Sequence, residues 1–255
     1  MLWYSQFVEW RTDHLNEGDG VVVGADQFQE WLLPWWWDNF IKHNSFPVTF
    51  VDFGLSQEKK NWCQERGELI TLPFLDVLVK DKEEVEAERA EKWENRYGEY
   101  FWDYRKAWFK KPLACLQSPY RRTLWLDLDC EVLGPLSDLF HASEHPTGVA
   151  LVKDAISDES PFPIYNSGVI AFQRKAPVLT AWAEQSLERN GEFRGDQDLL
   201  SQIIFETGVT VCEMPAIYNW NVAYGLNPRT VICHWIGDRG KHALRDQLIL
   251  KELTQ

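Results

Sequence analysis

The sequence predicts an α/β fold in which helices flank a mostly parallel sheet. The first seventy residues alternate between short apolar runs rich in β-branched residues and longer amphipathic segments, in the order strand, helix, strand, helix, strand. Such βαβ units are right-handed and place parallel strands in one sheet. A later apolar run, Leu124–Leu126, is also typical of a buried strand, and Gly134-Pro135 ends the segment after it.

The individual elements follow from apolar periodicity and from capping and turn residues. We expect strands at residues 21–26, 47–53, 68–72, 124–126, 147–152, 167–172, 209–213 and 231–237. We expect helices at residues 28–44, 57–66, 80–116, 176–188 and 199–205, a loop at 215–221 and a glycine-bearing turn at 237–241. The chain has 255 residues and no repeat or obvious linker, which favours one domain over residues 1–255.

Two carboxylates, Asp127 and Asp129, directly follow the apolar run. Residues two apart in a strand point to the same side, so both carboxylates can face one volume at the strand's carboxyl end. Ligands bind at this edge of parallel sheets, where residues 24–26 and Asp52 would also lie. Two like charges this close are costly unless a cation or a proton lies between them, and a hard divalent ion suits oxygen ligands. The alternative is that one or both carboxylates cap a turn.

The composition is that of a globular protein, with 45% apolar and 25% charged residues. A net charge of −13 excludes nucleic acid as the main partner, because phosphate binding needs a basic surface. It also argues against electrostatic attachment to anionic membranes, and no apolar run approaches the length of a membrane span. An anionic ligand would therefore need a local positive site or a metal ion.

The cysteines and the first residues predict a cytoplasmic location. Five cysteines, an odd number without the pair spacing of metal sites, indicate reduced thiols. Residues 1–10 carry Glu9 and lack the basic start and apolar core of a secretory signal.

Residues 80–105 form an acidic segment of helical composition. Four glutamates lie near its start, and aromatic residues follow at helical spacing. One interpretation is a solvated face over a stripe that packs on the core. The other is an element that docks an acceptor or a partner protein.

Five motifs in chain order carry a resemblance to a known family. They are Lys111, sixteen positions before Asp127, with the segment 111–129; Tyr165–Phe172 with its Asn-Ser-Gly; Gly195–Leu200 with its Asp-Gln; Tyr218-Asn219; and His234–Lys241. Together they resemble nucleotide-sugar-dependent glycosyltransferases of the GT-A fold, most closely glycosyltransferase family eight, the glycogenin and bacterial lipopolysaccharide galactosyltransferase group. The resemblance covers about residues 20–245 and implies a GT-A fold, a Rossmann-like, mostly parallel sheet flanked by helices.

The resemblance implies a metal site and a reaction. Asp127, Asp129 and His234 would bind Mn²⁺ or Mg²⁺, which would act as a Lewis acid on the leaving diphosphate of a nucleotide sugar, expected to be a UDP-sugar. The acceptor would be a glycan, a lipid-linked sugar or a protein. The family transfers sugar with retention of configuration. Asp196 or Gln197 could then shield or attack the anomeric carbon, or the leaving phosphate could guide the acceptor.

The same resemblance assigns substrate contacts. Lys241 would contact the diphosphate, and Lys111 the donor sugar or phosphate. The remaining expected contacts are Gly24, Ala25 and Asp26 with the nucleoside, Asn166, Asp196 and Gln197 with the sugar near its reacting carbon, and Asp52, Gly168 and Gly237 elsewhere along the substrate. For several of these residues a structural role competes, since residues 24–26 could be a plain βα turn and Asp196 a helix N-cap.

Two other functions remain open from the sequence. The run from Leu124 to Val132 also resembles the Asp-x-Asp strand of haloacid-dehalogenase-like phosphohydrolases, in which Asp127 would be the nucleophile and Asp129 the acid. However, Glu131 replaces the usual Thr or Val of that motif. The other possibility is a non-catalytic protein that keeps the fold and binds the nucleotide sugar without turnover.

Overall fold

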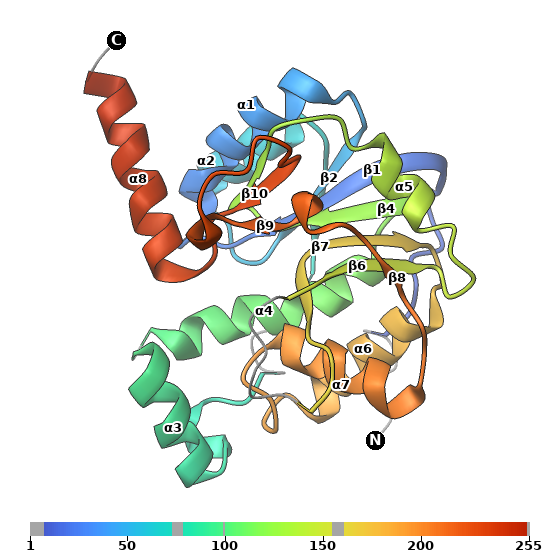
Figure 1. Cartoon of the computed structure of the whole chain (residues 1–255), viewed down its shortest axis with the longest axis vertical. Helices are drawn as coiled ribbons and strands as arrows, with labels where there is room; N and C mark the ends of the chain where they lie inside the picture. The colour runs from blue at the N-terminus through green and yellow to red at the C-terminus, as the bar shows by residue number, and fades with distance from the viewer. Residues whose placement is uncertain (1–7, 73–78, 99, 155–160, 254–255) are drawn as a thin grey trace.

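A mixed seven-stranded sheet forms the centre of the molecule (Figure 1). The computed structural model describes residues 8–72, 79–98, 100–154 and 161–253, so part of the segment used above to judge the signal peptide lies outside it. In spatial order the strands are β3 (Glu68–Thr71), β2 (Val48–Asp52), β1 (Asn16–Ala25), β4 (Tyr120–Leu126), β7 (Tyr165–Gln173), β6 (Val149–Lys153) and β8 (Cys212–Glu213).

Most neighbouring strands of this sheet are parallel. β1 pairs in parallel with both β2 and β4, β2 with β3, and β6 with β8, whereas β7 runs antiparallel to β4 and β6. The carboxyl ends of β1, β2 and β4 therefore meet at one edge of the sheet, as the sequence predicts. A small second sheet holds β5 (Cys130–Val132), β10 (Ile232–His234) and β9 (Trp220–Asn221), and it brings His234 to this edge from the far end of the chain.

Helices cover both faces of the main sheet. The described α-helices are α1 (Leu33–His43), α2 (Gln57–Gln64), α3 (Ala87–Tyr97), α4 (Phe101–Leu116), α5 (Ser137–Ala142), α6 (Pro177–Glu188), α7 (Asp196–Thr207) and α8 (Gly237–Leu253). Short 3₁₀ turns lie at Glu30–Leu32, Lys82–Glu84, Ala216–Tyr218 and Val222–Tyr224. Figure 1 shows α4, α6 and α7 on one face of the sheet, with α3 and α8 extending from the body.

The alternation of side chains along each strand divides the core in two. Leu124 and Leu126 of β4 pack with α1 and α5 on one face, while Trp125 between them packs with α4, α6 and α7 on the other. Full burial on both faces explains why this strand is an unbroken apolar run rather than an alternating one. Because both faces of the sheet are covered by apolar layers, polar side chains can reach a ligand only at the ends of the strands.

Three predicted elements differ in the structure. The loop expected at residues 215–221 instead holds a 3₁₀ turn and β9. The single helix expected at residues 80–116 is divided into a 3₁₀ turn, α3 and α4, because Gly98 ends α3 with a φ of +79°. The turn expected at residues 237–241 is instead the start of α8, so the prediction of a turn was wrong. Gly237 has a φ of +71°, a conformation that glycine adopts without strain where the chain leaves β10.

Among the described residues, no helix is both long enough and apolar enough to span a membrane.

Candidate active site

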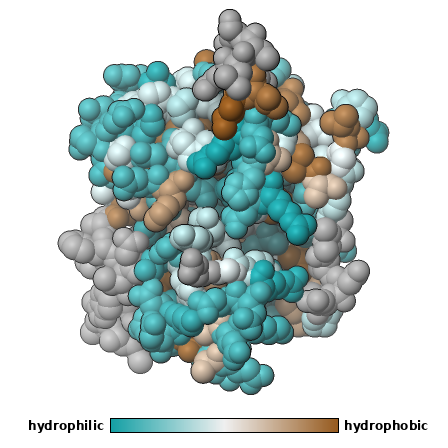
Figure 2. All heavy atoms as spheres, turned by 90° about the vertical axis from the view of Figure 1, so that its left-hand side faces the viewer, coloured by the Kyte–Doolittle hydropathy of each residue, from teal (hydrophilic) through white to brown (hydrophobic). Residues whose placement is uncertain are grey.

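A cavity of about 390 Å³ opens where the carboxyl ends of β1 and β4 face α4, α7 and the start of α8. It brings together residues from distant parts of the chain. The predicted site residues that line it are Gly24, Ala25, Asp26, Lys111, Asp127, Asp129, Asn166, Gly168, Asp196, Gln197, His234, Gly237 and Lys241. Figure 2 looks onto the side of the molecule that carries α8 and α3, and hydrophilic residues predominate there.

Asp127 and Asp129 reach the cavity from a turn and not from within a strand. β4 ends at Leu126, and the backbone N–H of Cys130 donates to the Asp127 carbonyl 3.0 Å away, which closes the turn. The alternation of a strand is therefore not the reason that both carboxylates face the same cavity. Each carboxylate also has its own cation, Lys111 for Asp127 and Lys241 for Asp129.

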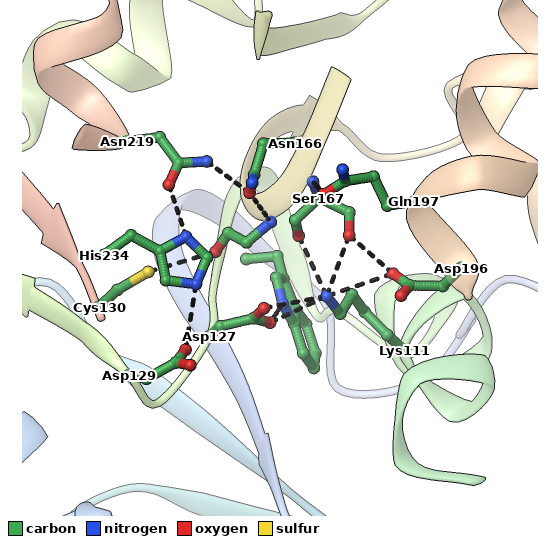
Figure 3. Close-up of polar contacts among 12 residues, drawn as sticks. Lys111, Asp127, Asp129, Cys130, Asn166, Ser167, Asp196, Gln197, Asn219 and His234 are labelled. Carbon is green, nitrogen blue, oxygen red and sulfur yellow. Dashed lines mark hydrogen bonds and ion pairs between the residues drawn. The ribbon is translucent and has the colours of Figure 1, made fainter. Parts of the chain in front are cut away.

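Lys111 is a buried ammonium that joins two carboxylates (Figure 3). Its Nζ lies 3.0 Å from Asp127 Oδ1 and 3.2 Å from Asp196 Oδ2, and it donates to the Ser167 carbonyl and hydroxyl oxygens, both at 3.2 Å. Burial lowers the pKa of Lys111, but Asp127 and Asp196 outweigh it, and the net pKa is raised. The side chain therefore stays charged and holds the end of β4 against the start of α7.

The start of α7 is fixed by its own side chains. The Ser167 hydroxyl donates to Asp196 Oδ2 at 2.8 Å, and the Ser167 backbone N–H donates to Gln197 Oε1 at 3.3 Å. Gln197 Nε2 donates in turn to Asp154 Oδ2 at 3.3 Å. Asp196 makes no N-cap bond at the start of α7, where Gly195 is the cap residue. Burial raises the pKa of Asp196, and the charge of Lys111 opposes that rise.

Asp129 and His234 face each other across the cavity floor. His234 Nε2 lies 3.2 Å from Asp129 Oδ1, and Lys241 Nζ lies 2.8 Å from Asp129 Oδ2. Burial by itself would raise the pKa of Asp129, but the ammonium of Lys241 lowers it well below its usual range. The carboxylate is therefore ionised and available as a ligand.

A chain of hydrogen bonds decides which nitrogen of His234 carries the proton. The backbone N–H of Gly168 donates to Asn166 Oδ1 at 2.8 Å, and Asn219 Nδ2 donates to the same oxygen at 2.8 Å. Because its amide nitrogen faces Asn166, Asn219 turns its Oδ1 toward His234 Nδ1, 2.7 Å away, and accepts a hydrogen bond from it (Figure 3). Nδ1 therefore carries a hydrogen, and in the neutral ring the Nε2 lone pair points toward Asp129.

This arrangement fits a divalent cation. A lone pair directed at a carboxylate oxygen is unfavourable unless a proton or a cation lies between them, and imidazole nitrogen and carboxylate oxygen are both ligands for first-row divalent ions. Asp127 lines the same cavity and can add a second carboxylate. Cys130 also lies within reach of Asp129 and His234, but burial raises the pKa of its thiol well above the usual value, so it is protonated.

Aromatic side chains line the cavity near Gly24 and Asp26. Gly24 lies here because a Cβ would be 2.4 Å from the ring of Phe53, so another residue would push that ring away. Asp26 accepts from the Gln29 backbone N–H at 3.0 Å, and burial raises its pKa. Tyr104 and Trp108 of α4 line the same cavity.

Asp52 is the one predicted site residue that the structure places elsewhere. Its carboxylate turns back on its own loop and accepts from the backbone N–H groups of Gly54 and Leu55 at 2.8 and 2.7 Å. It also pairs with Lys60 at 2.8 Å and does not line the cavity. A strand end places the backbone at the site, but the local turn decides where the side chain points.

Sequence reasoning assigned no role to several residues of the site. Ser167 lay inside a recognised motif, as did Asn219, but neither was connected to a partner. Trp125, whose Nε1–H donates to Asp127 Oδ1 at 2.7 Å, was counted with the core. The only sequence feature that could have indicated a role for these three residues is their position within or beside the motifs.

Comparison with solved structures identifies the fold. A galactosyltransferase, LgtC, solved in complex with donor and acceptor sugar analogues, covers 86% of this chain and 87% of its own at 14% identity, with a TM-score of 0.53. Mouse xyloside xylosyltransferase 1 covers 86% and 98% at 14% identity, with a TM-score of 0.54. The bifunctional glycosyltransferase WbbM reaches a TM-score of 0.61 over 90% of this chain and 47% of its own, also at 14% identity.

The chain has the GT-A glycosyltransferase fold. The predicted fold class is thus confirmed, and so is the resemblance to these enzymes at the level of structure. No protein-family model and no curated protein sequence matches the chain. The shared GT-A fold explains why the cavity lies at the carboxyl ends of the parallel strands.

Proposed function

We propose that this protein is a metal-dependent glycosyltransferase that moves a sugar from a nucleotide-diphosphate sugar, a UDP-sugar in the first instance, to a glycan, lipid-linked sugar or protein acceptor. The observation that carries the proposal is the Asp129–His234 pair, with Nε2 directed at the carboxylate, in a GT-A cavity that Asp127 and Asp196 also line. A fold alone does not define a function, whereas this site supplies the groups that the reaction needs.

The ion would be held by Asp127, Asp129 and His234 and would be Mn²⁺ or Mg²⁺. When bound, it would supply Lewis-acid neutralisation of the departing nucleoside diphosphate. Lys241 is half-buried beside Asp129, and the net effect of its surroundings is to raise its pKa, so it adds a positive charge next to that carboxylate. Burial makes these charges stronger toward a substrate than they would be in water.

The sugar end of the reaction would be served by α7. Glycosyl transfer develops positive charge at the anomeric carbon, and a nearby carboxylate stabilises it. Asp196 lines the cavity as a buried carboxylate that Lys111 and Ser167 hold in one orientation. Gln197, bonded to Ser167 and Asp154, presents a fixed amide beside it. Both groups would act in a transfer that retains configuration.

We also propose that the protein works in the cytoplasm as one domain. All five cysteines are unpaired, which accords with a reducing compartment. Residues 80–105 would be an addition to the common fold.

The test is release of nucleoside diphosphate from a panel of nucleotide sugars, with Mn²⁺, with Mg²⁺ and with chelator. We expect release with at least one donor, only in the presence of a metal, and we expect Asp129→Asn to abolish it while circular dichroism shows a folded chain. Asp246→Asn is the matched control, because Asp246 is exposed on α8, and it should leave the rate unchanged.

Two results would count against the proposal. Turnover by Asp129→Asn at the wild-type rate would remove the metal role. Binding of a nucleotide sugar without any release would instead identify a non-catalytic binding protein.

For Asp196→Asn we expect a loss in turnover that is larger than the loss in donor affinity, since the charge of Asp196 matters most in the transition state.

A further inference from the structure

A second hollow, a groove of about 860 Å³, lies beside the active-site cavity. One wall is α3, the helix from the acidic segment for which the sequence left a docking role open. The other wall is the start of α7 with the connection before it, and Asp154, Pro161, Phe162 and Ile164 form an end. The groove has more than twice the volume of the cavity where the donor would bind.

The groove adjoins the active-site cavity along a shared wall. Five residues line both hollows, namely Tyr97, Asp154, Arg194, Gln197 and Asp198. Gln197 is next to Asp196 in the chain, where the anomeric carbon would lie in the proposed reaction. A molecule lying along α3 would therefore meet the active-site cavity at this shared wall, next to Gln197.

Charges of both signs line the groove in nearly equal number. Among the described residues these are the cations Arg89, Lys92, Arg96 and Arg194 and the carboxylates Glu86, Glu88, Asp154, Glu192 and Asp198. Several already pair with one another, as Arg194 does with Asp198 at 2.7 Å and Arg89 with Glu86 at 3.2 Å. A surface with balanced, paired charge does not select a strongly anionic ligand such as a nucleic acid or a phospholipid headgroup.

The groove also presents aromatic rings. Tyr97 of α3 lines it together with Phe193 on the opposite wall and Phe162 at one end, while the ring of Trp93 is mostly buried behind α3. Rings that combine an apolar face with polar neighbours suit a ligand with both C–H faces and hydroxyl groups. A chain of uncharged sugars has this character, because each ring offers apolar faces and several hydrogen-bonding hydroxyls.

The walls of the groove are fixed before any ligand binds. Arg105 of α4 is fully buried, and its guanidinium donates to the carbonyls of Arg194 at 3.0 Å, Phe193 at 3.1 Å and Asn190, all in the connection before α7. Arg89 of α3 donates to the Gly191 carbonyl at 3.0 Å and ties the helix to the same connection. A preformed groove costs less to order when a ligand binds.

We propose that this groove is the acceptor site and that the acceptor is an uncharged oligosaccharide of two or more sugar units. The inference rests on the proposed glycosyltransferase function and extends it by naming the acceptor class. The oligosaccharide lies along α3 and directs its terminal hydroxyl toward Gln197. The α3 segment is thus the part of this chain that selects the acceptor.

Direct binding tests the inference without depending on turnover. The probes are neutral malto-, cello-, galacto- and manno-oligosaccharides of two to six units, measured by saturation-transfer NMR with the full chain. We expect one series to bind, with affinity that changes little with salt. Lys92→Trp and Gln202→Trp, which place a bulky ring in the groove from opposite walls, should weaken that binding at least about tenfold.

The control is Glu91→Trp, on the same helix but outside the groove, which should bind like the wild type. Donor hydrolysis, with water as the acceptor, should continue in both groove variants to within about twofold. Binding that both groove variants leave unchanged would overturn the inference, as would failure of every neutral series to bind. Binding restricted to sulfated or uronic saccharides, with strong salt dependence, would overturn it too. Oligosaccharide binding without donor hydrolysis would instead overturn the transferase function and leave the groove as a saccharide site.

Discussion

Arg105 gives the strongest prediction about stability. The guanidinium is completely buried and donates to four backbone carbonyls, those of Lys80, Asn190, Phe193 and Arg194. Burial lowers its pKa to about 10, so it remains charged at neutral pH. The side chain is surrounded by the rings of Trp93, Phe101, Trp102 and Phe109.

Arg105→Met keeps most of the apolar stem and removes all four hydrogen bonds to these carbonyls. Each buried carbonyl left without a partner destabilises the folded state by about 1–3 kcal/mol. Removing the buried charge also removes its desolvation penalty, which offsets part of this loss. We therefore expect the free energy of unfolding to fall by about 3–5 kcal/mol. Urea unfolding followed by tryptophan fluorescence measures the change. Hydrogen exchange should show the largest loss of protection around residues 190–194.

Arg189→Met is the matched control. Arg189 pairs with Glu192 at 3.1 Å and Glu206 at 3.0 Å on the surface, where such pairs contribute about 0–1 kcal/mol. If Arg105→Met destabilises the protein no more than Arg189→Met does, the carbonyls have other partners. The explanation of how the groove walls are held would then be wrong.

Three further predictions concern the site and its surroundings. Asn219→Leu should weaken Mn²⁺ binding about 10–100-fold by calorimetry with metal alone, because His234 loses the acceptor that fixes its proton; an unchanged affinity would show that the ring needs no such support. Gly168→Ala should weaken Mn²⁺ binding as well, since a Cβ would lie 2.2 Å from His234 Cε1, whereas Gly134→Ala, with 3.4 Å to its nearest neighbour, should not; equal affinities would contradict this geometry. Burial raises the pKa of Asp52, but Lys60 and two backbone N–H groups outweigh it and hold the pKa below 3.8. That carboxylate therefore adds stability above about pH 4, which is lost as the pH falls through its folded pKa, so Asp52→Asn should lower stability at pH 7 and flatten the acid limb of a melting curve; parallel curves would exclude this linkage.

The sequence by itself determined the fold class, and it predicted most of the residues that share the cavity. The apolar runs, each long enough for a buried strand, predicted the sheet, and five motifs in order predicted that Lys111, Asp127, Asp196, His234 and their neighbours act together. Local pattern was sufficient because a strand buried on both faces has to be apolar along its length, and its polar residues can lie only at the ends.

The tertiary structure alone decided how these side chains are paired. No spacing in the sequence indicates that Lys111 joins Asp127 to Asp196, or that Asn166 and Asn219 fix the proton on His234. The tertiary structure also showed that Asp52 turns away from the cavity and that α3 borders a groove. These facts depend on contacts between residues far apart in the chain, and the direction of a side chain is set by the neighbours that packing brings to it.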